Sequence, residues 1–198
     1  MGRPRVHDER TAAALIDAAE RIVAEEGIDA LSVRRVAREV GTTTRAVYSL
    51  FSSKEGLVVA IGARAFELLG SRVGEVPRTH DPACDLVLAG LEFRRFAREH
   101  PALFRIGVQR TDVPPQLARE FADTAYRALG KLRELVSRLH GSGQLGDRPI
   151  EDAIWEFHAL CEGLAAIEAR CLMAGLDSDR LWEDALTSLV RGWAAVDA

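Results

Sequence analysis

The chain has 198 residues, of which 47% are hydrophobic and 28% charged, and its net charge is −4. This composition is typical of a globular protein with one good core or two smaller ones. No apolar run approaches the ~20 residues of a membrane span, and the N-terminus lacks the apolar core of a signal peptide. The three cysteines, Cys84, Cys161 and Cys171, are odd in number and lack paired spacing, which indicates reduced thiols. We therefore expect a cytoplasmic protein that has no contact with a membrane.

The first predicted helix covers about residues 9–26. Its apolar side chains recur with helical spacing, and Gly27 follows the last of them as a C-terminal cap. The spacing gives this helix one face for a core and one face for solvent.

The segment 32–57, SVRRVAREVGTTTRAVYSLFSSKEGL, has the pattern of a helix-turn-helix that continues into a third helix. The small Ala37 lets the two short helices approach each other, and Gly41 can adopt the positive φ of a sharp turn. The intervening Arg, Thr and Ser side chains can face a phosphate backbone. The wedge between the helices is filled by Val36, Val40, Val47 and Leu50.

Capping side chains support this register. Ser32 precedes the first helix of the motif, Thr43 precedes the second, and Ser52 with Glu55 forms a capping box for the third. A helix N-terminus also favours a bound phosphate, so a capping role is compatible with a DNA contact.

Charge is distributed unevenly along the chain. Residues 34–64 contain six basic and two acidic side chains, a net charge of +4, which leaves −8 for the rest of a chain whose total is −4. A small basic element on an acidic body is typical of a DNA-facing surface, whereas the average charge of the chain alone argues against nucleic acid.

Beyond the motif, helical patterns alternate with breaks at proline or glycine. Pro101 ends one helix because its ring disfavours α geometry in the preceding residue. Strand patterns of alternating polarity are absent, so the expected fold class is all-α with about nine helices. The further predicted segments are about 53–73, 82–100, a short one at 102–109, 116–140, 150–174 and 178–196.

The helix predicted at 150–174 is apolar around most of its circumference, and the helix at 178–196 has a second apolar stripe. In a small chain, one side can pack on its own core and the other on a second chain, which gives a four-helix bundle. The alternative is a monomer in which both helices are central. Candidate dimer-interface residues are Cys161, Leu164, Ala165, Leu172, Leu181, Ala185, Leu189 and Trp193.

The order of a helical opening, ALSVRRVAREVG and then TTTRAVYSLFSSKEGL resembles the tetracycline-repressor (TetR) family of transcriptional regulators. The match covers about residues 9–60. The resemblance implies a homodimeric repressor with a three-helix DNA-binding domain at residues 1–54. It also implies a helical bundle at residues 55–198 for effector binding and dimerisation. The residues that carry the match are Gly41, Val47, Tyr48, Phe51, Ser53, Lys54 and Glu55.

The resemblance also assigns DNA contacts. Ser32, Thr43, Tyr48 and Lys54 match positions that usually hold the phosphate backbone, and Thr42, Thr44, Arg45 and Ser49 match positions that face groove edges. Arg45 is the best candidate for a bidentate contact with guanine. Arg3 and Arg5 could reach the minor groove as a basic arm, or form a solvated tail. The chain departs from the family pattern at Ser49 and Leu50, where a histidine and an aromatic residue are common, and at Gly56, where a second Glu is usual.

The sequence indicates the effector site much less specifically than the DNA-binding site. We expect an unknown, apolar to amphipathic small molecule, and no cofactor is indicated. Nine candidate residues, most of them aromatic, either line a cavity between helices or fill the core. Among them, His158 and Glu162 form either a polar pair that faces the ligand or an ordinary hydrogen bond within the protein. The candidates are Phe93, Phe96, Phe104, Val108, Phe121, Tyr126, Trp155, His158 and Glu162.

Other functional classes fit less well. The chain lacks G-x-S-x-G, H-E-x-x-H, P-loop and G-x-G-x-x-G motifs, so an enzyme is not expected. A metal-sensing variant could use His158, Cys161 and Cys171, which lie at helical spacing, although cysteine is commonly a small buried hydrophobe. The remaining alternative is a helical interaction module that does not bind DNA.

Overall fold

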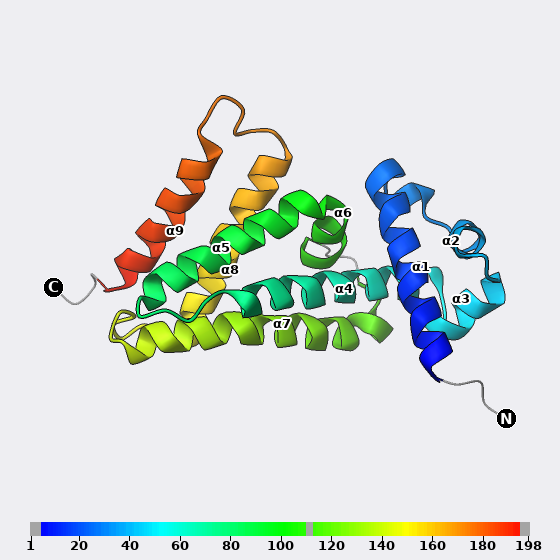
Figure 1. Ribbon diagram of the computed structural model, residues 1–198, viewed down its shortest axis with the longest axis horizontal. Helices are drawn as coiled ribbons and strands as arrows, with labels where there is room; N and C mark the ends of the chain where they lie inside the picture. The colour runs from blue at the N-terminus through cyan, green and yellow to red at the C-terminus, as the bar shows by residue number, and fades with distance from the viewer. Residues whose placement is uncertain (1–4, 110–112, 195–198) are drawn as a thin grey trace. The chain divides into compact units, whose positions relative to one another are not determined.

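The computed structural model describes residues 5–109 and 113–194, and for Arg5, Val6, His7 and Glu120 it describes the backbone alone. Every regular element in these ranges is helical, with nine α-helices, one 3₁₀ turn (η1) and one π turn (η2), which confirms the predicted all-α class (Figure 1). None of these helices combines the length and the apolar character that a membrane span needs. The elements are α1 (Arg5–Glu26), η1 (Ile28–Ala30), α2 (Val33–Val40), α3 (Thr44–Phe51), α4 (Lys54–Glu75), α5 (Pro82–Glu99), α6 (Pro101–Leu103), η2 (Phe104–Val108), α7 (Pro115–Gly141), α8 (Ile150–Ala169) and α9 (Ser178–Ala194).

The chain divides into two compact units. The first unit comprises the described residues within Met1–Phe66 and His100–Asp123, and the second those within Glu67–Glu99 and Thr124–Ala198. Helices α4 and α7 therefore contribute residues to both units. The functional boundary expected between residues 54 and 55 coincides with the first turn of α4, and it stays a prediction.

In the first unit, α1 packs against α2, α3 and α6. Its core positions are those with helical spacing in the sequence, and full burial of an apolar side chain of this kind contributes about 1.5–3 kcal/mol. Val47 of α3 and Leu57 and Ile61 of α4 are completely buried in the same unit. The buried side chains of α1 are Leu15, Ala18, Ala19, Ile22 and Val23.

Two helix ends differ from the prediction. Ser52 was expected to cap α4 in a capping box with Glu55, and this is wrong: Ser53 is the cap, and its hydroxyl accepts a hydrogen bond from the Gly56 N–H at 2.9 Å. The shift arises because Ser52 adopts a φ of 65° and ends α3 instead. Helix α8 ends at Ala169, earlier than expected, and the positive φ of 57° at Cys171 prevents its continuation.

In the second unit, α5, α8 and α9 pack together around a buried ion pair. Arg94 of α5 is 7% exposed, and its guanidinium donates to both carboxylate oxygens of Glu168 in α8, with Nη2–Oε1 at 2.7 Å and Nε–Oε2 at 3.0 Å. Trp182 of α9 donates from Nε1 to the same carboxylate at 3.0 Å. Ser178 and Asp179 accept further hydrogen bonds from Arg94. The pair therefore joins three helices at one point.

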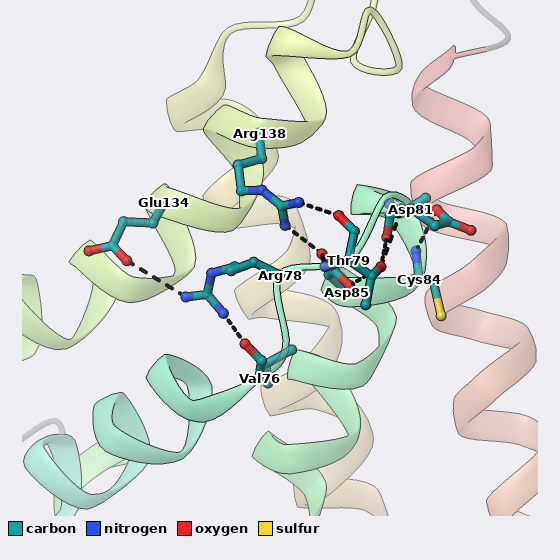
Figure 2. A network of polar contacts seen from close by, with 9 residues as sticks. Val76, Arg78, Thr79, Asp81, Cys84, Asp85, Glu134 and Arg138 are labelled. Carbon is teal, nitrogen blue, oxygen red and sulfur yellow. Dashed lines mark hydrogen bonds and ion pairs between the residues drawn. The ribbon is translucent and has the colours of Figure 1, made fainter.

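A second buried charge joins the α4–α5 connection to α7 (Figure 2). Asp85 is completely buried, and its carboxylate accepts hydrogen bonds from the Thr79 N–H at 2.9 Å and the Thr79 hydroxyl at 2.7 Å. Arg138 of α7 binds the same carboxylate and also the Thr79 carbonyl oxygen. Arg78 pairs with Glu134 of α7 at 3.7 Å. This network fixes the connection because each buried polar group in it has a partner.

Candidate nucleic-acid interface

The turn between α2 and α3 is built from one glycine and one capping threonine. Gly41 adopts a φ of 71°, and the Thr42 N–H donates to the Ala37 carbonyl at 2.9 Å, which closes the end of α2. The Thr43 hydroxyl accepts a hydrogen bond from the Ala46 N–H at 3.1 Å and so begins α3. The predicted turn glycine and the predicted cap at Thr43 are confirmed.

Helix α3 has one buried face and one exposed face. Val47 is completely buried, whereas Tyr48 has 52% of its surface exposed although it is a large aromatic residue. The exposed face carries hydroxyl and guanidinium groups, which are hydrogen-bond donors suited to phosphates and base edges. The predicted DNA-binding residues Ser32, Thr43, Thr44, Arg45, Tyr48 and Ser49 are all exposed, and Thr42 and Lys54 are half-buried.

Arg35 is held within the protein. Its backbone N–H donates to the Ser32 hydroxyl at 3.3 Å, which confirms the predicted cap of α2. Its guanidinium forms a two-pronged pair with Glu26 of α1, with Nη1–Oε2 at 2.7 Å, and lies 3.5 Å from Glu39. The hydrogen bond with Arg35 lowers the pKa of Glu26, and the same bond raises the pKa of Arg35. The charge of Arg35 is therefore neutralised by the protein itself.

The basic surface is consequently smaller than the sequence count suggests. Arg34, Arg38 and Arg45 are exposed, and Lys54 is half-buried at the start of α4. Sequence reasoning missed the Glu26–Arg35 pair because its members lie nine residues apart on two different helices. Helical spacing within one helix reports pairs three or four residues apart and therefore gives no signal for this contact.

The two arginines of the expected basic arm are only partly described. Arg3 lies outside the described residues, and for Arg5 the structure describes the backbone alone, as the first residue of α1. Helix α1 begins before residue 9, where the sequence pattern places its start.

The expected effector residues fall into both units. Phe104, Val108 and Phe121 belong to the first unit, and the others belong to the second. In the second unit the ring of His158 contacts Phe93 and Trp155, with centroid distances of 5.7 and 6.0 Å. The other placements are as follows: Phe96 and Phe104 are buried, Val108 and Phe121 are half-buried, and Tyr126 and Trp155 are 64% and 56% exposed.

The polar pair on α8 is partly desolvated, since 18% of the His158 side chain and 35% of the Glu162 side chain are exposed. His158 Nε2 lies 3.6 Å from Glu162 Oε2. Burial lowers the pKa of His158 and raises the pKa of Glu162, so that burial favours the neutral form of both groups. The contact is compatible with either of the two roles expected for this pair.

The expected dimer residues divide into buried and accessible ones. Cys161, Ala165 and Trp193 are buried within the chain, and Trp193 donates from Nε1 to Glu156 at 2.7 Å. The accessible ones are Leu164, Leu181, Ala185 and Leu189, which are half-buried, and Leu172, which is 67% exposed. Ile167 and Leu176, which sequence reasoning did not select, are 38% and 59% exposed nearby in the chain.

The described residues contain no group of three or more His, Cys, Asp or Glu side chains placed to hold a metal ion. Of the residues considered for a metal, Cys171 is exposed while Cys161 is completely buried, and burial raises the pKa of the Cys161 thiol. A raised pKa disfavours the thiolate that binds metals.

A surface recess of about 520 Å³ lies between α5 and α9. It contains none of the expected effector residues, and its charged lining is balanced between arginines and carboxylates. Its lining residues are Leu91, Arg94, Arg95, Arg98, Glu99, Asp179 and Glu183. Helical spacing could not predict this recess because α5 and α9 are far apart along the chain.

Both the N-terminal and the C-terminal part of the chain match known protein families. Residues 15–61 match the model of bacterial regulatory proteins of the tetR family, and residues 86–189 match the tetracyclin repressor-like C-terminal domain. The chain is 25% identical over 181 residues to the uncharacterized HTH-type transcriptional regulator Rv0681 of Mycobacterium tuberculosis, covering 90% of this chain and 79% of the relative. It is 36% identical over 72 residues to the HTH-type nicotine-responsive transcriptional repressor HdnoR of Paenarthrobacter nicotinovorans, covering 36% of each chain.

A solved structure has the same fold. The transcriptional regulator FadR from Bacillus subtilis, in complex with stearoyl-CoA, superposes with a TM-score of 0.75 at 17% identity, covering 91% of this chain and 98% of that one. The family models together cover most of the chain, and the C-terminal model alone covers more than half of it. The chain therefore belongs to the TetR family and is a DNA-binding transcriptional regulator.

Proposed function

We propose that the protein is a homodimeric repressor that leaves a palindromic operator when a small-molecule effector binds. The observation that supports the proposal best is the exposed face of α3, where polar and basic side chains stand opposite the completely buried Val47. A recognition helix needs this combination, because one face must hold the helix in its unit while the other enters the major groove.

Each side chain on this face has a distinct role in the proposal. Tyr48 and Lys54 bind phosphate oxygens, together with Ser32 and Thr43 at the helix N-termini, and these contacts set position without reading sequence. Arg45 reads guanine through two parallel hydrogen bonds, which is worth about 1–3 kcal/mol of discrimination. The other groove-facing residues are Thr42, Thr44 and Ser49. Arg3 and Arg5 remain assigned to a minor-groove arm.

The proposed dimer interface lies on the accessible apolar surface of α8 and α9. Four apolar residues of these helices are half-buried in a single chain and would become buried in a dimer: Leu164, Leu181, Ala185 and Leu189. The exposed Leu172, which follows α8, is assigned to the same interface. The residues already buried, Cys161, Ala165 and Trp193, support this surface from inside. A symmetric dimer places two α3 helices for successive half-sites of a palindrome.

The proposed effector is an apolar to amphipathic small molecule that binds the part of the chain after residue 54. Two relatives support this class, since one is named as nicotine-responsive and the other was solved with stearoyl-CoA. Among the candidates within the second unit, the aromatic side chains of Phe93 and Trp155 each lie against the ring of His158.

The test is a fluorescence-anisotropy titration of the protein against DNA upstream of its own coding region, at two salt concentrations. We expect tight, salt-sensitive binding that Arg45→Ala weakens by about ten- to one-hundred-fold. Arg180→Ala, which removes an exposed arginine of α9, serves as the matched control and leaves the affinity unchanged. A panel of apolar and amphipathic compounds is then screened for loss of the anisotropy signal. If neither this DNA nor a duplex selected from random sequence is bound, the protein is not a repressor of this kind.

A further inference from the structure

The two-residue connection between α3 and α4 contains an unfavourable backbone conformation. Ser52 adopts φ 65° and ψ −36°, and the Ser53 N–H donates to the Phe51 carbonyl at 2.7 Å. This geometry is a γ-turn with a positive φ, which is rare and strained for a residue that has a Cβ. Such a conformation is unfavourable and persists only where the surrounding structure holds it.

Gly56, at a position where the family pattern usually has a glutamate, permits an especially close approach of α4 to the end of α3 in this chain. A Cβ built on Gly56 would overlap the carbonyl oxygen of Phe51, so the first turn of α4 lies directly against the last carbonyl group of α3. The Gly56 N–H donates to the Ser53 hydroxyl at 2.9 Å, which holds the same turn of α4 in place. Because the obstructing atom belongs to the backbone, any other residue at position 56 must displace the end of α3.

The displaced segment is the one that carries the proposed DNA contacts. The Tyr48 carbonyl accepts a hydrogen bond from the Ser52 N–H at 2.9 Å, so the last turn of α3 is tied to the γ-turn. Lys54 begins α4 immediately after the turn. We infer that Ser52 and Gly56 together fix the direction of α3 relative to α4, and that Gly56 is a positioning residue for sequence-specific DNA binding. The inference rests on the proposed role of α3 as the recognition helix.

The two components of DNA affinity respond differently to a displaced helix. Hydrogen bonds to base edges depend on the direction of each donor, so a shift of α3 weakens specific binding. The attraction of lysine and arginine for phosphates is long-ranged and tolerates such a shift. A positioning residue therefore changes the ratio of specific to non-specific affinity, whereas general loss of folded protein lowers both alike.

The experiment compares wild type with Gly56→Ala on two duplexes of equal length, one selected from random sequence by the wild-type protein and one of random sequence. We expect the variant to lose at least about tenfold in the ratio of specific to non-specific affinity, with non-specific binding close to that of wild type. The control is Gly130→Ala in α7, where the added methyl group meets no atom within 4 Å. It keeps the wild-type ratio and melts at an equal or higher temperature, as alanine in an unobstructed helix does.

The possible outcomes separate the inference from the proposed function. If the wild type selects no duplex, the proposed function fails and the inference fails with it. If the wild type selects a duplex and Gly56→Ala has the same ratio, the inference alone is overturned. If Gly56→Ala does not fold by circular dichroism, Ser52→Val decides, because a β-branched side chain at this φ disturbs the turn without adding an atom at position 56. A lowered ratio then supports the inference, and an unchanged ratio overturns it.

Discussion

The two units of the chain use charged side chains in opposite ways. In the first unit the arginines of α2 and α3 lie at the surface, and the pair between Arg35 and Glu26 is open to solvent. In the second unit Arg94 and Asp85 are buried, and each is bound by several partners. An exposed charge can meet a ligand, whereas a buried charge must stay paired and holds helices together. The difference teaches that burial and pairing within the protein, rather than the number of arginines, decide which arginines are available for DNA.

The largest effect is expected at the buried pair of the second unit. Glu168→Ala leaves the guanidinium of Arg94 and the indole N–H of Trp182 without their shared acceptor, although Arg94 keeps Asp179 and Ser178, and we expect the free energy of unfolding to fall by about 2–4 kcal/mol. The measurement is urea denaturation followed by circular dichroism. Glu183→Ala, at an exposed position of α9, is the matched control and changes stability by less than about 0.5 kcal/mol. DNA affinity is measured at a temperature where the variant is folded. If the folded variant binds DNA more weakly, the buried pair of the second unit contributes to DNA binding as well as to stability, and the contrast between the two units is wrong.

The next effect concerns the buried carboxylate of Asp85. Burial alone would raise its pKa, but hydrogen bonds from Thr79 and Arg138 outweigh burial and hold the pKa below its ordinary value. The stabilisation is therefore fully present above the unfolded pKa of about 3.9 and is lost as the pH falls through the lower folded-state value. We expect Asp85→Asn to unfold more easily at pH 7 by about 2 kcal/mol, and less so as the pH falls below 4.

Denaturation series at several pH values test this expectation. Asp152→Asn, at an exposed position in the first turn of α8, is the control, and its curve should follow that of wild type. A difference between Asp85→Asn and wild type that stays constant down to the lowest pH would mean that the pKa of Asp85 is the same in the folded and the unfolded protein, and would contradict a lowered pKa in the folded state.

Local features of the sequence predict much of the first unit. The caps at Ser32 and Thr43 and the left-handed Gly41 follow from rules that act over three or four residues, and the structure has all three. The cap of α4 was misplaced by one residue for a physical reason. Both Ser52 and Ser53 are good capping residues, and the choice depends on the approach of Gly56 to the Phe51 carbonyl, which propensity does not encode.

Long-range contacts could not be predicted from the same rules. The carboxylate of Asp85 meets Arg138 from another helix, and Glu168 meets Arg94 across a still longer stretch of chain. In the sequence each of these residues looks like an ordinary charge on a helix face. The effector residues belong to the same class of problem, because an aromatic side chain such as Trp155 has the same helical spacing whether it lines a cavity or is exposed.

A smaller effect is expected at the exposed tyrosine of α3. Tyr48→Phe removes one hydrogen bond to phosphate, and we expect all duplexes to bind about fivefold more weakly with their order of preference unchanged, because a phosphate contact carries no sequence information. Tyr126→Phe, at the 64% exposed tyrosine of the second unit, is the control and leaves DNA affinity as it is. A changed order of preference in Tyr48→Phe would show that this hydroxyl reads a base.

The smallest effect distinguishes two arginines of the same helix. Arg38 is exposed, and Arg38→Gln should reduce the salt dependence of DNA binding by about one unit of slope per half-site, as the loss of one phosphate contact does. Arg35 is bound by Glu26 and Glu39, so Arg35→Gln should leave the slope unchanged. The measurement is the logarithm of the association constant against the logarithm of the salt concentration. If both variants reduce the slope equally, Arg35 exchanges its carboxylate partners for a phosphate on DNA, and the pair with Glu26 is then part of the binding surface.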